Sequence, residues 1–250
     1  MDGSVWVILP TYNEVENIEA VVGGIRAAAP DARVLVVDDN SSDGTGALAD
    51  RIADDVLHRP GKQGLGRAYT AGFARALEQG ADFVVEMDAD LSHDPADLPR
   101  LIEPAAAGCD LVLGSRYVDG GGVENWDLTR RVLSSAGCAY ARRVLGVPVR
   151  DLTGGFKCFR ATTLQRIDAG TAEAQGYAFQ VELTWRVLSL GLQVLEVPIR
   201  FRERRLGESK MSARIALEAA WRVPALRFAP RRWRPGLDAQ HRADALMQEG

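Results

Sequence analysis

Cysteine and histidine are scarce in this sequence, and the few that occur are too scattered to form a site. There are three of each type, with no CxxC pair and no cluster that combines the two: Cys109, Cys138, Cys158, His58, His93 and His241. This spacing excludes a disulfide framework and a structural zinc site. It also offers no Ser/His/Asp or Cys/His arrangement for nucleophilic catalysis. We expect the cysteines to be small buried residues in a reducing compartment.

Long apolar runs and an excess of basic charge are also lacking. No window approaches the roughly 18 uninterrupted apolar residues of a transmembrane helix. The opening residues MDGSVWVILP lack the basic and apolar regions of a signal peptide. A net charge of −4 gives no reason to expect nucleic acid as a partner. With 46% hydrophobic and 26% charged residues, the 250-residue chain is expected to form one α/β domain in the cytoplasm.

Short apolar runs alternate with segments of helical periodicity in the first half of the chain. Four runs are rich in β-branched residues, which is typical of strands buried on both faces: residues 5–9, 34–37, 83–85 and 111–113. Four segments have apolar residues at helical spacing: 14–28, 45–53, 65–78 and 95–107. This alternation predicts a mostly parallel sheet with helices on both faces. Such sheets bind ligands at the carboxyl ends of their strands.

The pattern changes after Tyr117. Helical spacing predicts three more helices, and a further apolar run predicts a strand: residues 126–145, 177–190 and 215–228 for the helices, and 193–202 for the strand. Pro224 is expected to bend the last helix. Residues 1–234 are therefore expected to form the domain, and 235–250 a polar, disordered tail.

Polar motifs follow each predicted parallel strand. "PTYNE" follows the first, "DDNSSDGT" the second, "DADLSH" a later one, and "GSRY" the strand after that. Because the carboxyl ends of parallel strands meet at one edge of a sheet, we expect these motifs to form one site.

The acidic stretch "EMDADLSHDP" needs a positive partner, since like charges placed this close repel each other. Asp88 and Asp90 can converge on one point, and two hard carboxylates suit Mg²⁺ or Mn²⁺. The alternative is a helix-capping acid next to a turn acid. Asp94, before Pro95, is expected to be such a cap. His93 is expected to be a turn residue, and Glu86 has no evident role.

The acidic pair in "VVDDNSSDGT" has two interpretations. Asp38 or Asp39 can bind the ribose or base of a nucleotide, as acidic residues at strand ends do. Alternatively the segment is a simple turn in which Ser42 or Asp43 caps the following helix. The pair also resembles that of a phosphoacceptor receiver domain, but there it follows the first strand. "GKQGLGRAY" lacks the GK[ST] spacing of a P-loop and is expected to be a glycine-rich turn.

Cations occur in "GSRY" and in "RERRLGESKM". Arginine forks and a lysine point charge are the groups that bind a diphosphate. A solvated charged surface is the alternative for any single arginine. Lys210 is the stronger candidate, because the rest of the chain is nearly free of lysine.

These motifs occur together in one known family. The series PTYNE, VVDDNSSDGT, GLGRA, DADLSHDP, GSRY, WDLTRR, DLTGGFK, GYAFQVE and GESKM, over residues 5–212, resembles the polyprenol-phosphate (dolichol-phosphate) mannose synthases of glycosyltransferase family 2. The resemblance implies a single-domain GT-A fold that is Rossmann-like, with amphipathic C-terminal helices. It implies GDP-mannose as donor, a polyprenyl phosphate as acceptor, and Mg²⁺ or Mn²⁺ as cofactor.

The resemblance also implies roles for single residues. Five would bind the guanosine side of the donor: Pro10, Tyr12, Glu14, Val37 and Asp39. Asp88 and Asp90 would hold the metal, with Ala89 packed on the nucleotide. Some relatives have a further glutamine ligand where this chain has Ser92, and we expect water to substitute.

The remaining carried-over roles concern the two phosphates. Arg116, Arg204 and Lys210 would contact the donor phosphates, and Arg130 and Ser134 would bind the acceptor phosphate. Asp90, Arg116 and Lys210 are therefore the expected catalytic residues, since a metal and cations stabilise the charge that develops on the leaving diphosphate.

The acceptor chemistry agrees with the absence of an evident general base. A phosphate monoester has a second pKa of about 6, so it is already largely dianionic at pH 7. Attack opposite the leaving group would invert the anomeric centre and give a β-linked product. Two alternatives remain at this point. One is transfer of glucose or an N-acetylhexosamine to the same lipid, and the other is a non-catalytic nucleotide-sugar or signalling module.

Some relatives have C-terminal transmembrane helices, and we expect none in this sequence. We expect peripheral binding to the cytoplasmic face of the membrane through segments 126–145 and 215–233. Arginines would face anionic headgroups, with Trp221, Phe228 or Trp233 at the boundary. The alternative is ordinary docking of these helices onto the sheet. A separate membrane-embedded partner subunit is left open.

Overall fold

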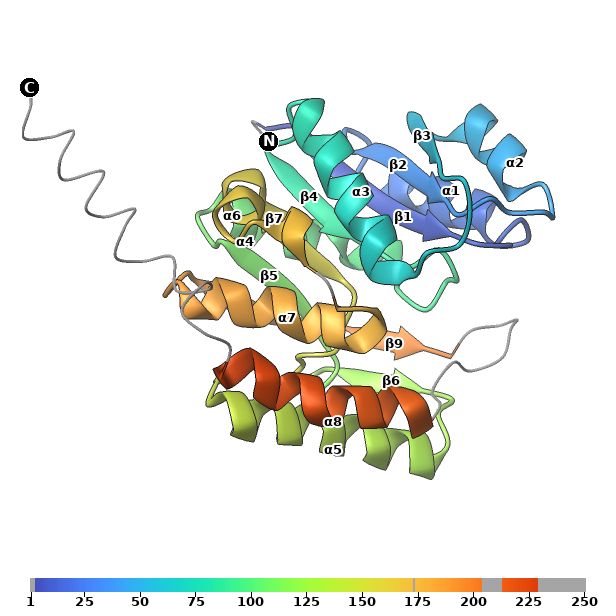
Figure 1. Cartoon of the computed structure of the whole chain (residues 1–250). Coiled ribbons are helices and arrows are strands. Elements are labelled where there is room, and N and C mark those ends of the chain that lie inside the picture. The colour runs from blue at the N-terminus through green and yellow to red at the C-terminus, as the bar shows by residue number, and fades with distance from the viewer. Residues whose placement is uncertain (1–2, 173, 204–212, 229–250) are drawn as a thin grey trace, which may run out of the picture.

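The computed structural model describes residues 3–172, 174–203 and 213–228, with the backbone alone for 213–220. Its centre is a seven-stranded sheet in the order β3-β2-β1-β4-β7-β5-β8 (Figure 1). The strands are β1 (Val5–Thr11), β2 (Arg33–Asp38), β3 (Asp55–His58), β4 (Phe83–Glu86), β5 (Leu111–Ser115), β7 (Lys157–Arg160) and β8 (Val194–Pro198). Every neighbouring pair is parallel except the two that involve β7. The predicted α/β fold with a mostly parallel sheet is confirmed.

Helices cover both faces of this sheet because its strands are apolar on both sides. Trp6 and Ile8 of β1 pack on the side of α3 (Leu65–Glu78) and α7 (Gly176–Ser189). Val5, Val7 and Leu9 pack on the other side, against α1 (Ile18–Ala28), α2 (Thr45–Ile52) and α4 (Leu98–Ala106). This alternation is the two-residue period of a strand buried on both faces.

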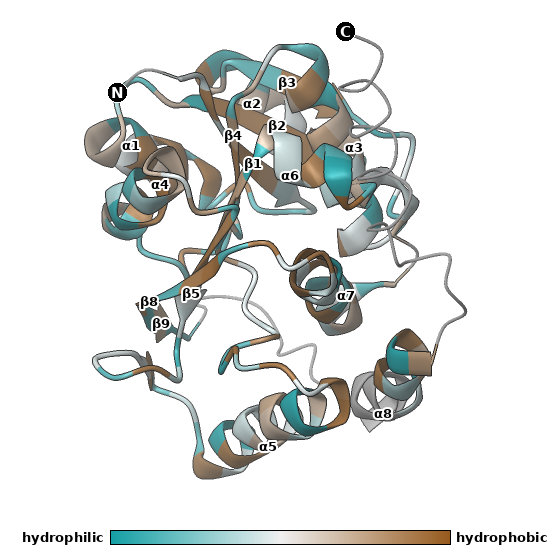
Figure 2. Cartoon of the chain, turned by 90° about the vertical axis from the view of Figure 1, so that its left-hand side faces the viewer, coloured by the Kyte–Doolittle hydropathy of each residue, from teal (hydrophilic) through white to brown (hydrophobic). Residues whose placement is uncertain are grey.

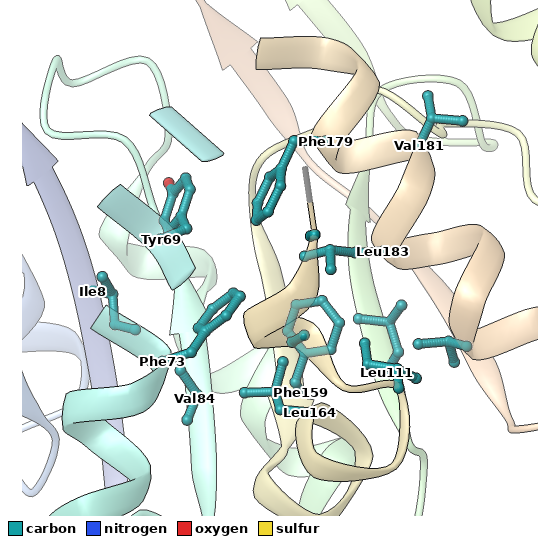
Figure 3. Packing of buried hydrophobic residues seen from close by; sticks show 14 of the residues in the cluster. Ile8, Tyr69, Phe73, Val84, Leu111, Phe159, Leu164, Phe179, Val181 and Leu183 are labelled. Atoms are coloured by element: carbon teal, nitrogen blue, oxygen red, sulfur yellow. The ribbon is translucent and has the colours of Figure 1, made fainter. Parts of the chain in front are cut away.

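An aromatic group joins α3 and α7 above the sheet (Figure 3). The Tyr69 and Phe179 rings are stacked with centroids 6.1 Å apart and planes 3° from parallel. Phe73 lies next to both and meets Phe159 of β7 edge-on at 6.0 Å. Offset and edge-on pairs of this kind add to the free energy gained by burying their apolar area. The two helices that flank the candidate site are therefore fixed to each other.

The four predicted parallel strands are present, and the largest differences in helix boundaries in the first half of the chain concern α1 and α4. α1 begins at Ile18 rather than at residue 14, because residues 14–17 form a turn in which the Glu14 carbonyl accepts from the amides of Asn17 and Ile18. The segment 95–107 divides into a 3₁₀ turn, η1 (Pro95–Asp97), followed by α4. α3 has the predicted bounds.

The sequence patterns missed several short elements. β3, β7 and the helix α6 (Ala161–Arg166) were not predicted. The expected strand at 193–202 is two strands, β8 in the main sheet and β9 (Arg200–Arg202), which pairs with β6 (Gly122–Glu124) in a separate two-stranded sheet. A further 3₁₀ turn, η2, spans Ala169–Thr171. These elements are three to six residues long, too short for a period to be recognised.

Two long helices lie side by side at one end of the molecule (Figure 1). α5 (Leu128–Leu145) begins two residues later than predicted, after Asp127, whose carboxylate accepts a hydrogen bond from the Arg130 amide at 2.8 Å. α8 (Ala213–Phe228) continues through Pro224 as one helix. Within the described part of the chain, no helix combines the length and the apolar character needed to cross a membrane. The expected tail at 235–250 lies outside the described residues.

Gly72 allows α3 to approach the sheet closely, which leads to a stability prediction. A Cβ atom at Gly72 would lie 2.6 Å from Cγ2 of Ile8. We expect Gly72→Ala to lower the free energy of unfolding by about 1–3 kcal/mol through overpacking. Gly23→Ala on α1 is the matched control, since its Cβ would meet nothing within 4 Å. It should be neutral or raise stability by up to about 1 kcal/mol. Urea unfolding measures both, and equal effects would contradict this reading.

Candidate active site

The carboxyl ends of β1 and β2 are tied together by the first two polar motifs. Thr11 and Asp38 are direct partners in the β1–β2 register. The Asp38 carboxylate accepts from the Thr11 hydroxyl at 2.9 Å and from the Ser41 amide at 3.0 Å. Asp38 therefore closes the turn after β2. Of the two aspartates that sequence reasoning left open, it is the one that holds the backbone.

Asp39 faces cations instead. Nη1 of Arg59 donates to its carboxylate at 2.6 Å, and the Gln63 amide approaches its other oxygen at 3.4 Å. Asp39 and Arg59 are both buried. Burial raises the pKa of Asp39, and the Arg59 charge offsets part of that rise. The pair places a carboxylate next to a guanidinium, which suits a nucleobase that offers both a donor and an acceptor.

The other residues expected on the guanosine side differ in accessibility. Tyr12 is 40% exposed, and the ammonium of Lys62 lies 3.8 Å from its ring centroid. Glu14 accepts from the Asn17 side chain at 2.9 Å, and Pro10 is partly buried at the end of β1. The Val37 side chain is fully buried beneath α3. The structure therefore places Tyr12 at the surface and the Val37 side chain in the core.

The "DAD" motif forms the turn after β4. Oδ1 of Asp90 accepts from the Ser92 amide at 3.0 Å, and the Tyr69 hydroxyl approaches Oδ1 of Asp88 at 3.4 Å. Asp88 is partly buried and Asp90 is buried. Ala89 is buried in the core cluster beneath the turn. The two aspartates are thus brought to one turn at the carboxyl edge of the sheet, as predicted.

His93 and Asp94 have structural roles in this turn. Nδ1 of His93 accepts from the Asp88 amide at 3.2 Å, which puts the ring proton on Nε2. Its ring stacks on Phe156 at 4.9 Å, and burial lowers its pKa, so the neutral form is favoured. Oδ1 of Asp94 accepts from the Ala96 amide at 3.0 Å, which confirms Asp94 as an N-cap.

A buried polar cluster lies beneath the aspartate turn. Glu86 of β4 and Lys157 of β7 are direct partners across the antiparallel pair, and both are fully buried. The Lys157 ammonium donates to the Gln180 carbonyl at 2.8 Å. Burial raises the pKa of Glu86 and lowers that of Lys157, and the attraction between the two offsets part of each shift. Glu86, which had no role in the sequence, thus faces a lysine that sequence reasoning missed.

Arg116 is held by a carboxylate that was also missed. Nε and Nη2 of Arg116 donate to the two oxygens of Asp151, both at 2.7 Å, and Nη2 also donates to Thr153 at 2.8 Å. Arg116 and Asp151 are buried. Burial alone would raise the pKa of Asp151, but the Arg116 guanidinium and its backbone amide together lower it. Asp151 lies within the "DLTGGFK" motif, which was the available signal.

The residues expected at the acceptor phosphate lie on one side of α5. Nη1 of Arg130 donates to Glu203 at 2.9 Å, and its guanidinium carbon lies 4.2 Å from the Trp126 ring centroid. The Ser134 hydroxyl accepts from the Tyr117 hydroxyl at 2.7 Å. Tyr117 follows Arg116 at the end of β5, so this hydrogen bond connects α5 to the carboxyl edge of the sheet. Arg204 and Lys210 lie outside the described residues.

The oxygen atoms at the aspartate turn suit a hard divalent cation whose other ligands are water and phosphate oxygens. Within the described ranges, no group of three or more His, Cys, Asp and Glu side chains is gathered closely enough to hold a metal. Asp88 and Asp90 alone offer two carboxylates. The buried Ser92 hydroxyl next to them has no hydrogen-bond partner among the described residues. Mg²⁺ commonly binds through one or two carboxylates plus water and phosphate oxygens, so this set suits it.

Comparisons with known proteins agree with this geometry. Residues 6–168 match the family model "Glycosyl transferase family 2". The chain is 49% identical over 223 residues to "Polyprenol monophosphomannose synthase" of Mycolicibacterium smegmatis, covering 87% of this chain and 84% of that protein. It is 51% identical over 232 residues to "Undecaprenyl-phosphate mannosyltransferase" of Micrococcus luteus, covering 91% and 95%.

A solved structure has the same fold at lower sequence similarity. Glucosyl-3-phosphoglycerate synthase from Mycobacterium tuberculosis in complex with phosphoglyceric acid superposes with a TM-score of 0.71 and 21% identity, covering 92% of this chain and 81% of that one. The same synthase solved with Mn²⁺, UDP-glucose and phosphoglyceric acid has a TM-score of 0.69 and 22% identity, with 90% and 80% covered. At this identity the likeness concerns the fold. The family match over residues 6–168 and the two relatives at about half identity show that this chain belongs to glycosyltransferase family 2.

Proposed function

We propose that the protein transfers mannose from GDP-mannose to a polyprenyl phosphate, giving polyprenyl-phosphate mannose and GDP. The main support is the sequence identity of 49% and 51%, over most of the chain, to two enzymes whose names specify mannose and a polyprenyl phosphate. The polar residues gathered at the carboxyl edge of the sheet are compatible with a nucleotide sugar.

Asp39 and Tyr12 are the proposed base-side contacts of the donor. The Asp39 carboxylate next to Arg59 matches guanine, whose edge offers N–H donors beside a carbonyl acceptor. Glu14 and Pro10, near the end of β1, complete this end of the proposed site. The Val37 side chain lies in the core, so a contact from it would come through the main chain alone.

Asp88 and Asp90 are the proposed ligands of a divalent cation, Mg²⁺ or Mn²⁺. When bound, such an ion neutralises the negative charge that develops on the leaving diphosphate. The residues of the chain assist in the same sense: Lys210 and Arg204 are proposed to contact the diphosphate. Arg116 is engaged by Asp151 through two hydrogen bonds, which fix its guanidinium at the edge of the site while the carboxylate compensates its charge.

Arg130 and Ser134 are the proposed contacts of the acceptor phosphate. Arg130 is already paired with Glu203, whose side chain is exposed, so a phosphate dianion can replace that carboxylate. A dianionic phosphate needs no base to remove a proton. This agrees with the neutral, buried state of His93 and with its use of Nδ1 to hold the turn. Direct attack opposite the leaving group would give inversion.

The face formed by α5 and α8 is the proposed contact with the membrane. Large apolar side chains are exposed along both helices: Leu128, Val132, Leu133 and Tyr140 on α5, and Trp221 and Phe228 on α8. Figure 2 shows apolar residues along α5, with α8 next to it at the same end of the molecule. Arg131 and Arg143 are exposed on the same helix and suit anionic headgroups. This face supports peripheral binding on the side where the acceptor lipid is found.

The donor and acceptor are tested directly by product mass. Incubation with Mg²⁺ or Mn²⁺, a polyprenyl phosphate and a panel of nucleotide sugars should yield a hexose adduct of the lipid from GDP-mannose. If the enzyme prefers a UDP-sugar, GDP-mannose is not its donor and the alternative of another transferred sugar holds. Absence of turnover with every donor, despite nucleotide-sugar binding, would favour the non-catalytic alternative.

The assignment of Asp90 as a metal ligand predicts a large loss of activity when this residue is changed. Asp90→Asn removes a charged oxygen ligand, so kcat/KM should fall by about a hundredfold or more. Asp94→Asn is the matched control, because asparagine caps a helix as well as aspartate does. It should keep activity within about twofold. Steady-state kinetics over a Mn²⁺ titration measures both, and near-wild-type activity of Asp90→Asn would contradict the assignment.

The acceptor assignment predicts an effect on one substrate alone. Arg130→Ala removes a charged hydrogen-bond donor, so the KM for detergent-solubilised polyprenyl phosphate should rise by about ten- to a hundredfold. The KM for GDP-mannose should stay within about twofold. Arg131→Ala, exposed on the next position of α5, should change neither. A larger effect on the nucleotide sugar would move the acceptor site elsewhere.

If α5 and α8 contact the membrane, removing their exposed apolar side chains should weaken membrane binding but leave activity on a soluble acceptor unchanged. Leu128→Ser, Val132→Ser and Leu133→Ser combined should reduce flotation with liposomes of phosphatidylglycerol by at least about tenfold. Turnover of a short-chain, water-soluble acceptor should be unchanged. Leu195→Ser, which is also exposed but lies on β8, is the control. Unchanged flotation of the triple variant would show that these helices do not contact the bilayer.

A further inference from the structure

Trp126, the residue before the N-cap of α5, has a ring that lies close to two arginines of the candidate site. The guanidinium carbon of Arg130 lies 4.2 Å from its ring centroid, and that of Arg116 lies 5.7 Å away. Both distances fall within the range in which a cation is attracted to an aromatic face. The indole itself is 8% exposed, so packing limits its movement.

The two arginines depend on this ring to different degrees. Arg116 is already fixed by its two hydrogen bonds to the buried Asp151. Arg130 has a weaker anchor, because its partner Glu203 has a side chain that is 42% exposed. Solvent-exposed ion pairs contribute little to holding a geometry. The indole face of Trp126 is therefore the most firmly placed described group against the Arg130 guanidinium.

Further rings connect Trp126 to the aspartate turn. Phe201 of β9 meets Trp126 edge-on at 5.5 Å and His93 edge-on at 5.2 Å. His93 in turn accepts the hydrogen bond from the Asp88 amide. One continuous row of rings thus extends from the turn with the proposed metal ligands to the proposed acceptor arginine on α5.

We propose that Trp126 is a positioning residue for the acceptor phosphate. Its indole face holds the Arg130 guanidinium at a fixed position relative to the turn that contains Asp88. The proposal rests on the proposed role of Arg130. The positioning matters because the attacking phosphate oxygen must lie close to the anomeric carbon and in line with the leaving group. Without the indole, the Arg130 side chain would be more mobile before binding and would lose more conformational entropy when it binds the lipid phosphate. That loss would appear as a higher KM.

The indole N–H offers a competing explanation that the structure allows us to test. It is buried and has no acceptor among the described residues, so it could donate to a ligand. The same is true of Trp6, which lies in the core with Arg33 5.4 Å from its ring centroid. An unpaired indole N–H therefore indicates no ligand by itself. What distinguishes Trp126 is its contact with two arginines of the site.

Three variants separate these explanations. Trp126→Leu removes the aromatic face, and the KM for polyprenyl phosphate should rise by about tenfold while the KM for GDP-mannose stays within about twofold. Trp126→Phe keeps a face and loses the N–H, and it should restore the KM to within about threefold of wild type. Trp6→Phe, the matched control, should leave both KM values unchanged. If Trp126→Leu does not fold, Trp126→Met takes its place.

A double variant shows whether Trp126 acts through Arg130. In the Arg130→Ala background, Trp126→Leu should raise the KM for the lipid phosphate no further, because the group it positions is absent. Additive effects would overturn the proposal, as would a Trp126→Phe variant as impaired as Trp126→Leu. If Arg130→Ala raises the KM and Trp126→Leu does not, this inference alone is wrong. If Arg130→Ala itself has no effect, the proposed acceptor site is wrong and the inference falls with it.

Discussion

The antiparallel strand β7, inserted between β4 and β5, is the constraint on which the rest of the site depends. The chain before and within β7 contacts three parts of the site in turn. Asp151 binds Arg116, Phe156 stacks on His93, and Lys157 lies opposite Glu86. β4 with its aspartate turn and β5 before Arg116 do not pair with each other, and β7 joins the two into one sheet by pairing with both.

β7 also explains why so much charge is buried beneath the site. An unpaired buried ion is costly, whereas a buried ion with a charged partner and hydrogen bonds is tolerated. Lys157 donates to the Gln180 carbonyl on α7, and its charge offsets part of the rise that burial causes in the pKa of Glu86 on the next strand. Lys157 thus links β7 to α7 by a hydrogen bond and to β4 by charge attraction, which helps to hold the sheet and α7 in one arrangement. The geometry of the edge therefore depends on partners within the protein.

The elements that depend on residues close together in the chain could be predicted from the sequence. The apolar runs of β1, β2, β4 and β5, the bounds of α3 and the cap at Asp94 all follow from residues close together in the chain. The resemblance to a known family supplied the site residues, and the structure brings Asp39, Asp88, Asp90 and Arg116 to one edge of the sheet. Their roles remain predictions.

The missed features share a physical cause, which is that the partners are distant in sequence. Asp151 lies 35 residues after Arg116, and although it belongs to the DLTGGFK motif, nothing in the local pattern pairs its carboxylate with that arginine. Lys157 likewise becomes meaningful only when β7 is placed next to Glu86. The contacts of Trp126 with Arg116, which follows β5, and with Phe201 of β9 likewise appear only in the folded chain. Four-residue strands such as β7 are also too short to show alternation.

The attachment of α5 has a consequence for the timing of motions near the acceptor. Its buried residues are Cys138, Ala141 and Leu145, all in its C-terminal half. Arg130 and Ser134 are in the other half, where the neighbouring side chains are exposed. Local opening is easiest where few apolar contacts hold a segment. The amides of the first turns of α5 should therefore exchange with deuterium well before those of its last turns, which would let the acceptor half of the helix open while the sheet stays folded.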